Sequence, residues 1–156
     1  VNIITFYTGF KMVKKSIVSF IKVSDFESLS HNIILLNATS STEVLNPKNV
    51  SLSELNKEDF VIRIPTKMCA KGHRLMLYFY PKTINKILKK FPQDVIPKNF
   101  IAVEADVVDI LPSDQEEFMF PRLKVIISAL NSWTSIFNQY EARRSKIQSI
   151  TELVKP

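Results

Sequence analysis

Toward the end of the chain, the spacing of hydrophobic positions changes from that of a strand to that of a helix. Leu123, Val125 and Ile127 recur at every second position, which is the period of a β-strand. Further on, apolar residues recur at steps of three and four and form one stripe along a helix: Trp133, Ile136, Phe137, Tyr140, Ile147, Ile150 and Val154. We therefore predict a strand from Phe118 that leads into one long helix, whose apolar stripe packs on the residues upstream.

Upstream of that helix, the pattern predicts short strands separated by turns. Alternating or β-branched runs cover residues 17–23, 33–37, 50–52, 60–64, 74–80 and 100–111. Neighbouring strands joined by short turns favour an antiparallel sheet over β-α-β units. We expect a mostly β protein (β plus α), a small antiparallel six-stranded β-barrel or strongly curved sheet over which the long C-terminal helix packs.

Two short helices are predicted between these strands. Ser24 and Glu27 have the spacing of a capping box, which starts a helix that runs to about His31. Residues 82–91 change to helical spacing, with apolar residues on one face and lysines on the other. This short inserted helix either plugs one end of the barrel through its apolar face or lies with its lysines on an anionic surface.

Length and composition indicate one folded domain. With 156 residues, 46% of them hydrophobic, the chain can bury a core of its own. We expect this domain to cover residues 17–156, and residues 1–16 to be an extension that is either disordered or a miscalled start, with Met12 as the alternative first residue. Cys69 is the one cysteine, which excludes an internal disulfide and favours a reducing, cytoplasmic location. The sequence holds no run of eighteen apolar residues that could span a membrane.

Charge is distributed unevenly, although the net charge is only +6. Residues 63–98 hold nine Lys or Arg and one acid, a net of +8, whereas residues 99–121 hold six acids and no base, a net of −6. A basic field beside an acidic one suits anionic ligands, nucleic acid or a charged protein partner. The alternative is that both are solvated outer faces of strands. The candidate basic surface consists of Arg63, Arg74, Lys86, Lys89 and Lys90.

Aromatic residues beside the basic field suggest an alternative function. Tyr78 and Tyr80 share one face of their strand, with Phe79 on the other, and tyrosines stack on bases in proteins that bind single strands. A nucleic-acid-binding β-barrel that uses residues 63–98 is therefore the alternative. One aromatic face beneath the terminal helix explains the same pattern.

No arrangement of residues predicts catalysis or a metal site. Cys69 and His73 lie four residues apart but lack an orienting third group, so a loop cysteine explains them better than a nucleophile–base pair. Glu104, Asp106 and Asp109 could hold a cation, but an outward polar strand face explains them as well. Glycine occurs only at positions 9 and 72, so no Gly-rich phosphate loop can be built. We expect no enzymatic activity, no metal and no cofactor.

Two stretches carry a resemblance to a known family. One is the strand–helix passage with Arg-Leu-Lys-Val-Ile-Ile-Ser at 122–128 and Trp-x-x-Ile-Phe-x-x-Tyr-x-x-Arg-Arg at 133–144; the other is Asn49-Val50-Ser51. In these residues and in the order of its elements, the chain from about Ile33 to Val154 resembles a PilZ domain. The resemblance implies a six-stranded barrel that binds cyclic di-GMP and relays that signal to motility, secretion or polysaccharide machinery.

The same resemblance implies a ligand site at Asn49 and Ser51. PilZ domains bind the dinucleotide through Asp/Asn-x-Ser-x-x-Gly on an early strand and through an Arg-x-x-x-Arg stretch ahead of the barrel. This chain has Asn49 and Ser51 but carries Glu54 at the glycine position, and no arginine precedes Arg63. These departures argue against ordinary dinucleotide binding, and polarity at a strand edge explains Asn49 and Ser51 equally well.

Taken together, these patterns predict a non-enzymatic bacterial signalling or adaptor domain of PilZ type. It would act by docking to a protein partner through its charged middle strands and the exposed face of the terminal helix. Cyclic di-GMP is the small-molecule ligand that the resemblance offers.

Overall fold

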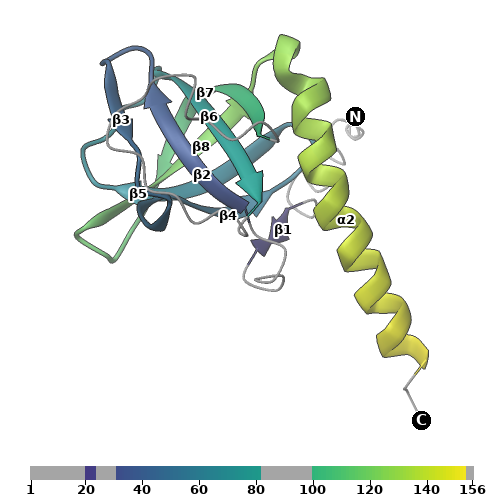
Figure 1. Cartoon of the computed structure of the whole chain (residues 1–156). Coiled ribbons are helices and arrows are strands. Elements are labelled where there is room, and N and C mark those ends of the chain that lie inside the picture. Colours follow the sequence, from purple (N-terminus) through teal and green to yellow (C-terminus); the bar gives the residue numbers. More distant parts are fainter. Residues whose placement is uncertain (1–19, 24–30, 82–99, 154–156) are drawn as a thin grey trace, which may run out of the picture.

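The computed structural model describes residues 20–23, 31–81 and 100–153. Eight strands form one antiparallel sheet with the order β1-β4-β5-β8-β7-β6-β2-β3 (Figure 1). The strands are β1 (Ile21–Lys22), β2 (His31–Asn37), β3 (Thr42–Val44), β4 (Ser51–Leu55), β5 (Asp59–Pro65), β6 (Arg74–Pro81), β7 (Ile101–Leu111) and β8 (Phe118–Val125). The mostly β, antiparallel architecture predicted from the sequence is confirmed, together with the C-terminal helix.

The sheet is curved but not closed, which corrects the expected six-stranded barrel. β1 and β3 are the two ends of the sheet, and no pairing between described residues joins them. β3 pairs with β2 only at residues 35–37, and β1 pairs with β4 only at residues 54–55. In a closed barrel, the free edges of β2 and β4 would pair with each other. Here β3 covers part of the β2 edge and β1 covers part of the β4 edge. Residues 31–34 of β2 and 51–53 of β4 are left to border a seam where the two strands come close.

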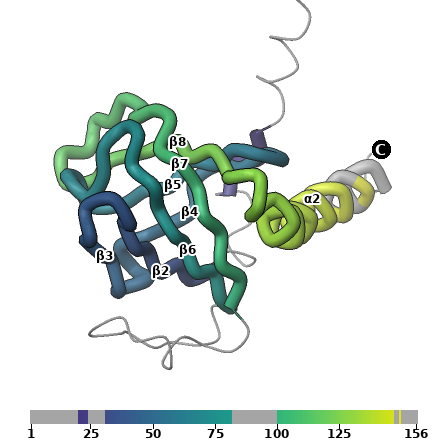
Figure 2. The backbone as a smooth tube through the Cα atoms, turned by 90° about the horizontal axis from the view of Figure 1, so that it is seen from above, coloured from purple at the N-terminus to yellow at the C-terminus, as the bar shows by residue number. Residues whose placement is uncertain are grey.

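Two β-bulges contribute to the curvature of the sheet. The register shifts between Leu52 and Glu54 in the β4–β5 pair, and between Val107 and Asp109 in the β7–β8 pair. An extra residue in one strand bends that strand and increases its local twist. Seen from above in Figure 2, the strands curl round an interior and the terminal helix lies to one side. The bulges therefore help to bend the sheet although the chain has only two glycines.

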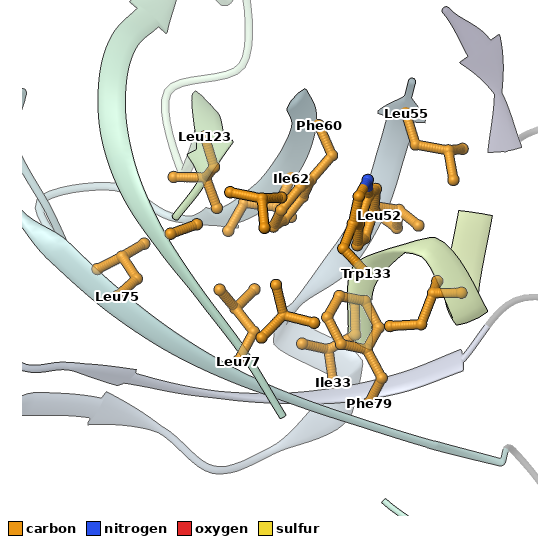
Figure 3. Packing of buried hydrophobic residues seen from close by; sticks show 14 of the residues in the cluster. Ile33, Leu52, Leu55, Phe60, Ile62, Leu75, Leu77, Phe79, Leu123 and Trp133 are labelled. Carbon is orange, nitrogen blue, oxygen red and sulfur yellow. The ribbon is translucent and has the colours of Figure 1, made fainter. Parts of the chain in front are cut away.

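The interior holds one apolar core, which the C-terminal helix completes (Figure 3). Phe60, Leu77 and Phe79 from the sheet are fully buried together with Trp133 of α2 (Leu130–Leu153). The rings of Trp133 and Phe60 stack with their centroids 4.4 Å apart. The indole Nε1 of Trp133 also donates a hydrogen bond to the backbone oxygen of Asn56, over 2.8 Å. This hydrogen bond satisfies the polar atom of a buried aromatic residue and fixes α2 to the β4–β5 turn.

The first half of α2 packs on the sheet. Among its described side chains, the buried ones are Trp133, Ile136, Phe137 and Tyr140, all of which belong to the predicted stripe. The C-terminal half of the helix extends past the sheet (Figure 1). In the part of the chain that the structure describes, no helix combines the length and apolarity needed to cross a membrane.

The junction between β8 and α2 differs from the prediction. β8 ends at Val125, and the 3-10 helix η4 (Ile127–Ala129) precedes α2. Ile127, expected on the buried face with Leu123 and Val125, is instead 87% exposed. The strand period stops at Val125 because the backbone turns into η4 two residues later.

A second, smaller apolar cluster lies on the opposite face of the sheet from Phe79. Ile34 and Tyr80 are buried there, with Leu45, Tyr78 and Phe100 packed against them. The rings of Tyr78 and Phe100 meet edge to face, with centroids 5.4 Å apart. The prediction that Tyr78 and Tyr80 share one face is confirmed.

Some predicted features lie outside the described residues. They are the extension over 1–16, the beginning of the strand over 17–23, most of the helix that starts at Ser24, and the inserted helix over 82–91. His31 is described, and it begins β2 instead of ending a helix. The sequence pattern does not predict β3 or the 3-10 helix η2 (Pro47–Asn49).

Candidate ligand-binding pocket

A pocket of about 830 Å³ opens at the seam between β2 and β4. Small-molecule sites in proteins are commonly clefts of roughly 300–1,000 Å³. We call this cavity the seam pocket. Its lining residues are Lys22, Val23, His31, Asn32, Pro47, Lys48, Val50, Ser51, Leu52, Ser53, Glu54, Arg63 and Phe120.

The seam pocket carries a positive charge. Lys22, Lys48 and Arg63 stand against one carboxylate, Glu54, so that three cations and one anion leave a net of +2 with His31 neutral. Lys22 is opposite Glu54 in the β1–β4 register. A concave surface lined with one sign of charge concentrates counter-ions of the other sign. The pocket is therefore suited to a ligand that carries phosphate or carboxylate groups.

Arg63 lies against an aromatic ring beside the pocket. Its guanidinium carbon is 4.2 Å from the centroid of the Phe118 ring, a cation–π arrangement. Its Nε is buried and has no hydrogen-bond partner among the residues that the structure describes. A buried donor without a partner costs about 1–3 kcal/mol. An anionic oxygen bound in the pocket is a candidate partner for this N–H.

Of the two residues selected by the family resemblance, only Ser51 lines the pocket. Ser51 begins β4 and pairs with Arg63 of β5 in the antiparallel register, so both side chains lie on the same face of the sheet. Asn49 ends η2, is exposed and does not line the pocket. Glu54, which stands where PilZ domains have glycine, follows the β-bulge and is also a lining residue.

The short helix η2 places Lys48 in the pocket lining. Asn46 is its N-cap residue, whose Oδ1 accepts a hydrogen bond from the backbone N–H of Lys48 over 3.0 Å. Pro47 follows at the first helical position, where its fixed φ suits the turn. The sequence Asn-Pro-Lys thus holds a lysine beside Ser51.

Arg74, the other described member of the candidate basic surface, is bound by carboxylates elsewhere on the sheet. Its Nη1 donates to Glu104 over 2.8 Å, its Nη2 donates to Asp106 over 3.2 Å, and its Nε makes a further short contact with Asp106. These carboxylates raise the pKa of Arg74. Arg74 is therefore neutralised locally and lies apart from the seam pocket. Lys86, Lys89 and Lys90 fall outside the described residues.

Contacts within the protein also account for the acidic residues that could have formed a cation site, Glu104, Asp106 and Asp109. Glu104 and Asp106 bind Arg74, and Asp109 accepts a hydrogen bond from the backbone N–H of Ile110. Within residues 20–23, 31–81 and 100–153, no group of three or more His, Cys, Asp or Glu residues is arranged to hold a metal ion. The outward polar face of a strand is the better interpretation.

The aromatic residues of the nucleic-acid alternative are not presented as a stacking platform. Tyr80 is only 1% exposed and belongs to the second apolar cluster, and burial raises its pKa. Tyr78 packs against Phe100 in the same cluster. With Arg74 already paired, the described residues of β6 offer little to a nucleic-acid strand.

Cys69 does not form an activated pair with His73. Burial of the Cys69 thiol raises its pKa to about 11, so it stays protonated near neutral pH. The Nδ1 atom of His73 already lies 3.0 Å from Nδ2 of Asn37 and accepts a hydrogen bond from the backbone N–H of Ala70 over 3.2 Å. These contacts favour the interpretation of a structural loop in which Cys69 is buried.

His31 is one of the pocket residues that sequence reasoning missed. It lines the seam pocket, and its Nδ1 lies 3.3 Å from the hydroxyl oxygen of Tyr140 in α2. Burial lowers the pKa of His31, and a hydrogen bond with the Gln139 side chain partly offsets that effect. No local signal could have found this arrangement, because Tyr140 is 109 residues away in the sequence.

Comparison with known proteins shows a likeness of fold. No family model matches the chain, and no curated protein matches it. Among solved structures, it is similar to the Bacillus subtilis inhibitor of motility MotI/DgrA, with a TM-score of 0.50 and 11% sequence identity. The match covers 82% of this chain and 50% of the other, so the chain spans about half the length of that protein. In fold, this curved antiparallel sheet with its C-terminal helix is therefore similar to part of a bacterial motility inhibitor.

Proposed function

We propose that the chain is a non-enzymatic signalling adaptor of PilZ type, which binds an anionic effector in the seam pocket and docks to a protein partner. Two independent likenesses support this proposal. The residues at 49–51 and 122–144 resemble a PilZ domain, a family that relays signals to motility machinery among other targets. The fold is similar to that of an inhibitor of motility.

The observation that carries the proposal is the position and charge of the seam pocket. Ser51, which the family resemblance selects as a ligand-binding residue, lines a cavity that also contains Lys22, Lys48 and Arg63. No reaction is needed to explain such a site, because a net positive cavity can bind a phosphate ester without transforming it.

We further propose cyclic di-GMP as the effector to test first. Its two phosphates would be neutralised by the lysines and Arg63, and Arg63 would take the place of the arginines that PilZ domains carry ahead of the barrel. Phe118 supplies an aromatic ring against that guanidinium, and Phe120 lines the same pocket. Glu54 opposes binding, because it adds a negative charge to a lining residue at which the family has no side chain. We therefore expect weaker binding than in PilZ domains with a complete motif.

The protein partner would bind the part of α2 that extends past the sheet. Arg143 and Lys146 are exposed there, and Arg144 forms an ion pair with Glu141 on the same helix, over 2.6 Å. This exposed surface carries positive charge, so we propose a partner with an acidic docking face.

Calorimetric titration distinguishes this function from the nucleic-acid alternative. Cyclic di-GMP and a single-stranded oligonucleotide would each be titrated into the full chain at low and at moderate salt. Dinucleotide binding that persists at moderate salt supports the proposal. Binding of the oligonucleotide alone, with an affinity that falls steeply as salt rises, would favour the alternative. If neither ligand binds, the proposal of a cyclic di-GMP effector fails and a docking function alone is left.

A further inference from the structure

We propose that His31 couples the charge in the seam pocket to the docking of α2 on the sheet. The inference rests on the proposed function only in taking this pocket as the ligand site. His31 contacts both parts of the molecule at once, since it lines the pocket and lies beside Tyr140. The side chain of Gln139, also on α2, is a second hydrogen-bond partner of the same imidazole.

A continuous set of aromatic contacts leads from His31 to the residue that fixes α2. The His31 ring lies 5.9 Å from the ring of Tyr140 and meets the ring of Phe79 edge to face at 6.0 Å, measured between centroids. Phe79 in turn lies 6.0 Å from Trp133, which stacks on Phe60. Tyr140, Phe79 and Trp133 are fully buried. Because closely packed side chains cannot move independently, a change at His31 reaches α2 through direct contacts.

The docked helix favours the neutral form of His31. Burial lowers the pKa of His31 below its ordinary value of 6.5, and the hydrogen bond with Gln139 acts in the opposite direction. The free energy that neutral His31 contributes to the docking of α2 is therefore fully present above pH 6.5. It is lost as the pH falls through the lowered pKa of His31. The charged groups that share the pocket with His31 are Lys22, Lys48, Glu54 and Arg63; Tyr140 is the titratable group of α2 beside it, and Phe79 of β6 adds no charge.

An anion in the pocket would act on this equilibrium. A nearby negative charge favours the imidazolium form, which places a charge beside the buried rings of Phe79 and Tyr140. Occupancy by an anion would thus loosen the contact between Tyr140 and the sheet. By linkage, loosening of α2 would strengthen anion binding by the same factor. The pocket would in this way control how α2 is presented to a partner.

The coupling can be tested without any ligand, through the charge of the pocket itself. Lys48→Glu reverses one exposed charge of the lining, and Lys71→Glu is the matched control in an exposed turn outside the pocket. NMR would follow the ring protons of His31, identified by their loss in His31→Gln. The indole proton of Trp133, the one tryptophan, would report on α2 docking across the same pH range.

We expect Lys48→Glu to raise the midpoint of His31 titration by roughly a few tenths of a pH unit. The pH-dependent change at Trp133 should move with it, whereas Lys71→Glu should move neither. In His31→Gln, the pH-dependent change in the indole signal of Trp133 should disappear. The double variant His31→Gln/Lys48→Glu should give the same Trp133 signal as His31→Gln alone. Tyr140→Phe, which keeps the ring and removes the hydroxyl, should shift the midpoint of His31. A Trp133 response that is the same with and without His31 would overturn the proposal.

Addition of cyclic di-GMP to the wild-type chain separates this proposal from the proposed function. If the dinucleotide binds and Trp133 does not respond, the coupling through His31 is wrong while the ligand assignment stands. If Lys48→Glu moves both titrations but cyclic di-GMP does not bind, the coupling stands and the ligand assignment is wrong.

Discussion

Trp133 is the single side chain on which the attachment of α2 depends most. It is fully buried, stacks on Phe60 and donates a hydrogen bond to the backbone of Asn56, two contacts that join the helix to β5 and to the β4–β5 turn. The sequence predicts its burial from helical spacing. It does not predict the stacking or the hydrogen bond, because Phe60 and Asn56 lie more than seventy residues upstream.

Replacement of Trp133 should therefore destabilise the whole fold. We expect Trp133→Ala to lower the free energy of unfolding by roughly 3–5 kcal/mol, since it leaves a cavity and removes the indole donor from the backbone oxygen of Asn56. Trp133→Phe should cost less, because it keeps most of the ring area. Urea denaturation followed by circular dichroism measures both variants. A cost below about 1 kcal/mol for Trp133→Ala would mean that α2 is held elsewhere.

Cys69 provides a test of the local environment at one residue. With its pKa raised to about 11, roughly one thiol in a thousand is ionised at pH 8. Alkylation by iodoacetamide at this pH should be slow in the folded protein and rapid in urea, as mass spectrometry can follow. Reaction of the folded chain as fast as a small-molecule thiol would contradict the described burial.

Residue identities in the pocket were only partly predictable. Ser51 and Arg63 were selected from the sequence, the first by a family resemblance and the second by charge. Their meeting in one cavity depends on the β4–β5 register and on the seam, which are non-local. His31 and Phe120 enter the pocket from strands whose local sequences carry no sign of it. Arg74 was selected for the same reason as Arg63, but its neighbours on β7 neutralise it.

At the scale of elements, regular periodicity was reliable where it was long. The strand-like run over residues 74–80 and the helical stripe from Trp133 to Tyr140 are both confirmed. The pattern fails at short elements: β3 has three residues and η2 has three, too few to show a period. Ile127 shows the converse, because an apolar residue continues the strand period past the true end of β8.

The cap of η2 leads to a prediction at this scale. Asn46→Ala removes the oxygen that accepts from the N–H of Lys48, so we expect a loss of stability of about 0.5–1 kcal/mol. The same change should weaken the binding of an anion in the seam pocket, since the turn that places Lys48 is no longer fixed. Asn46→Ser, which keeps a capping oxygen, is the control and should retain both properties. Chemical denaturation and calorimetry measure the two effects. Unchanged binding in Asn46→Ala would indicate that Lys48 does not need this turn.

At the scale of the molecule, the failure to close the barrel creates the candidate site. Composition and periodicity could not show whether the barrel closes, because closure depends on which strands pair with the outer edges of β2 and β4. In this fold, β1 and β3 take part of those edges and leave the seam between residues 31–34 and 51–53. The seam is lined by cations from β1, η2 and β5, which no single stretch of sequence contains.

The seam pocket and α2 form the two ends of the proposed signalling route. His31 lies at the pocket and beside Tyr140, so an effector and a partner could influence each other without a large rearrangement of the sheet. Such coupling requires only that neutral and protonated His31 differ in their contacts with α2.

The most direct test of the central claim is the affinity of the seam pocket for cyclic di-GMP with and without Arg63. Calorimetric titration of wild type, Arg63→Gln and Arg143→Gln compares a pocket arginine with an exposed arginine of α2. We expect binding to the wild type, a loss of about tenfold or more in Arg63→Gln because a charge-assisted hydrogen bond is removed, and little change in Arg143→Gln. No binding to the wild type, or equal binding to wild type and Arg63→Gln, would contradict the assignment of the pocket.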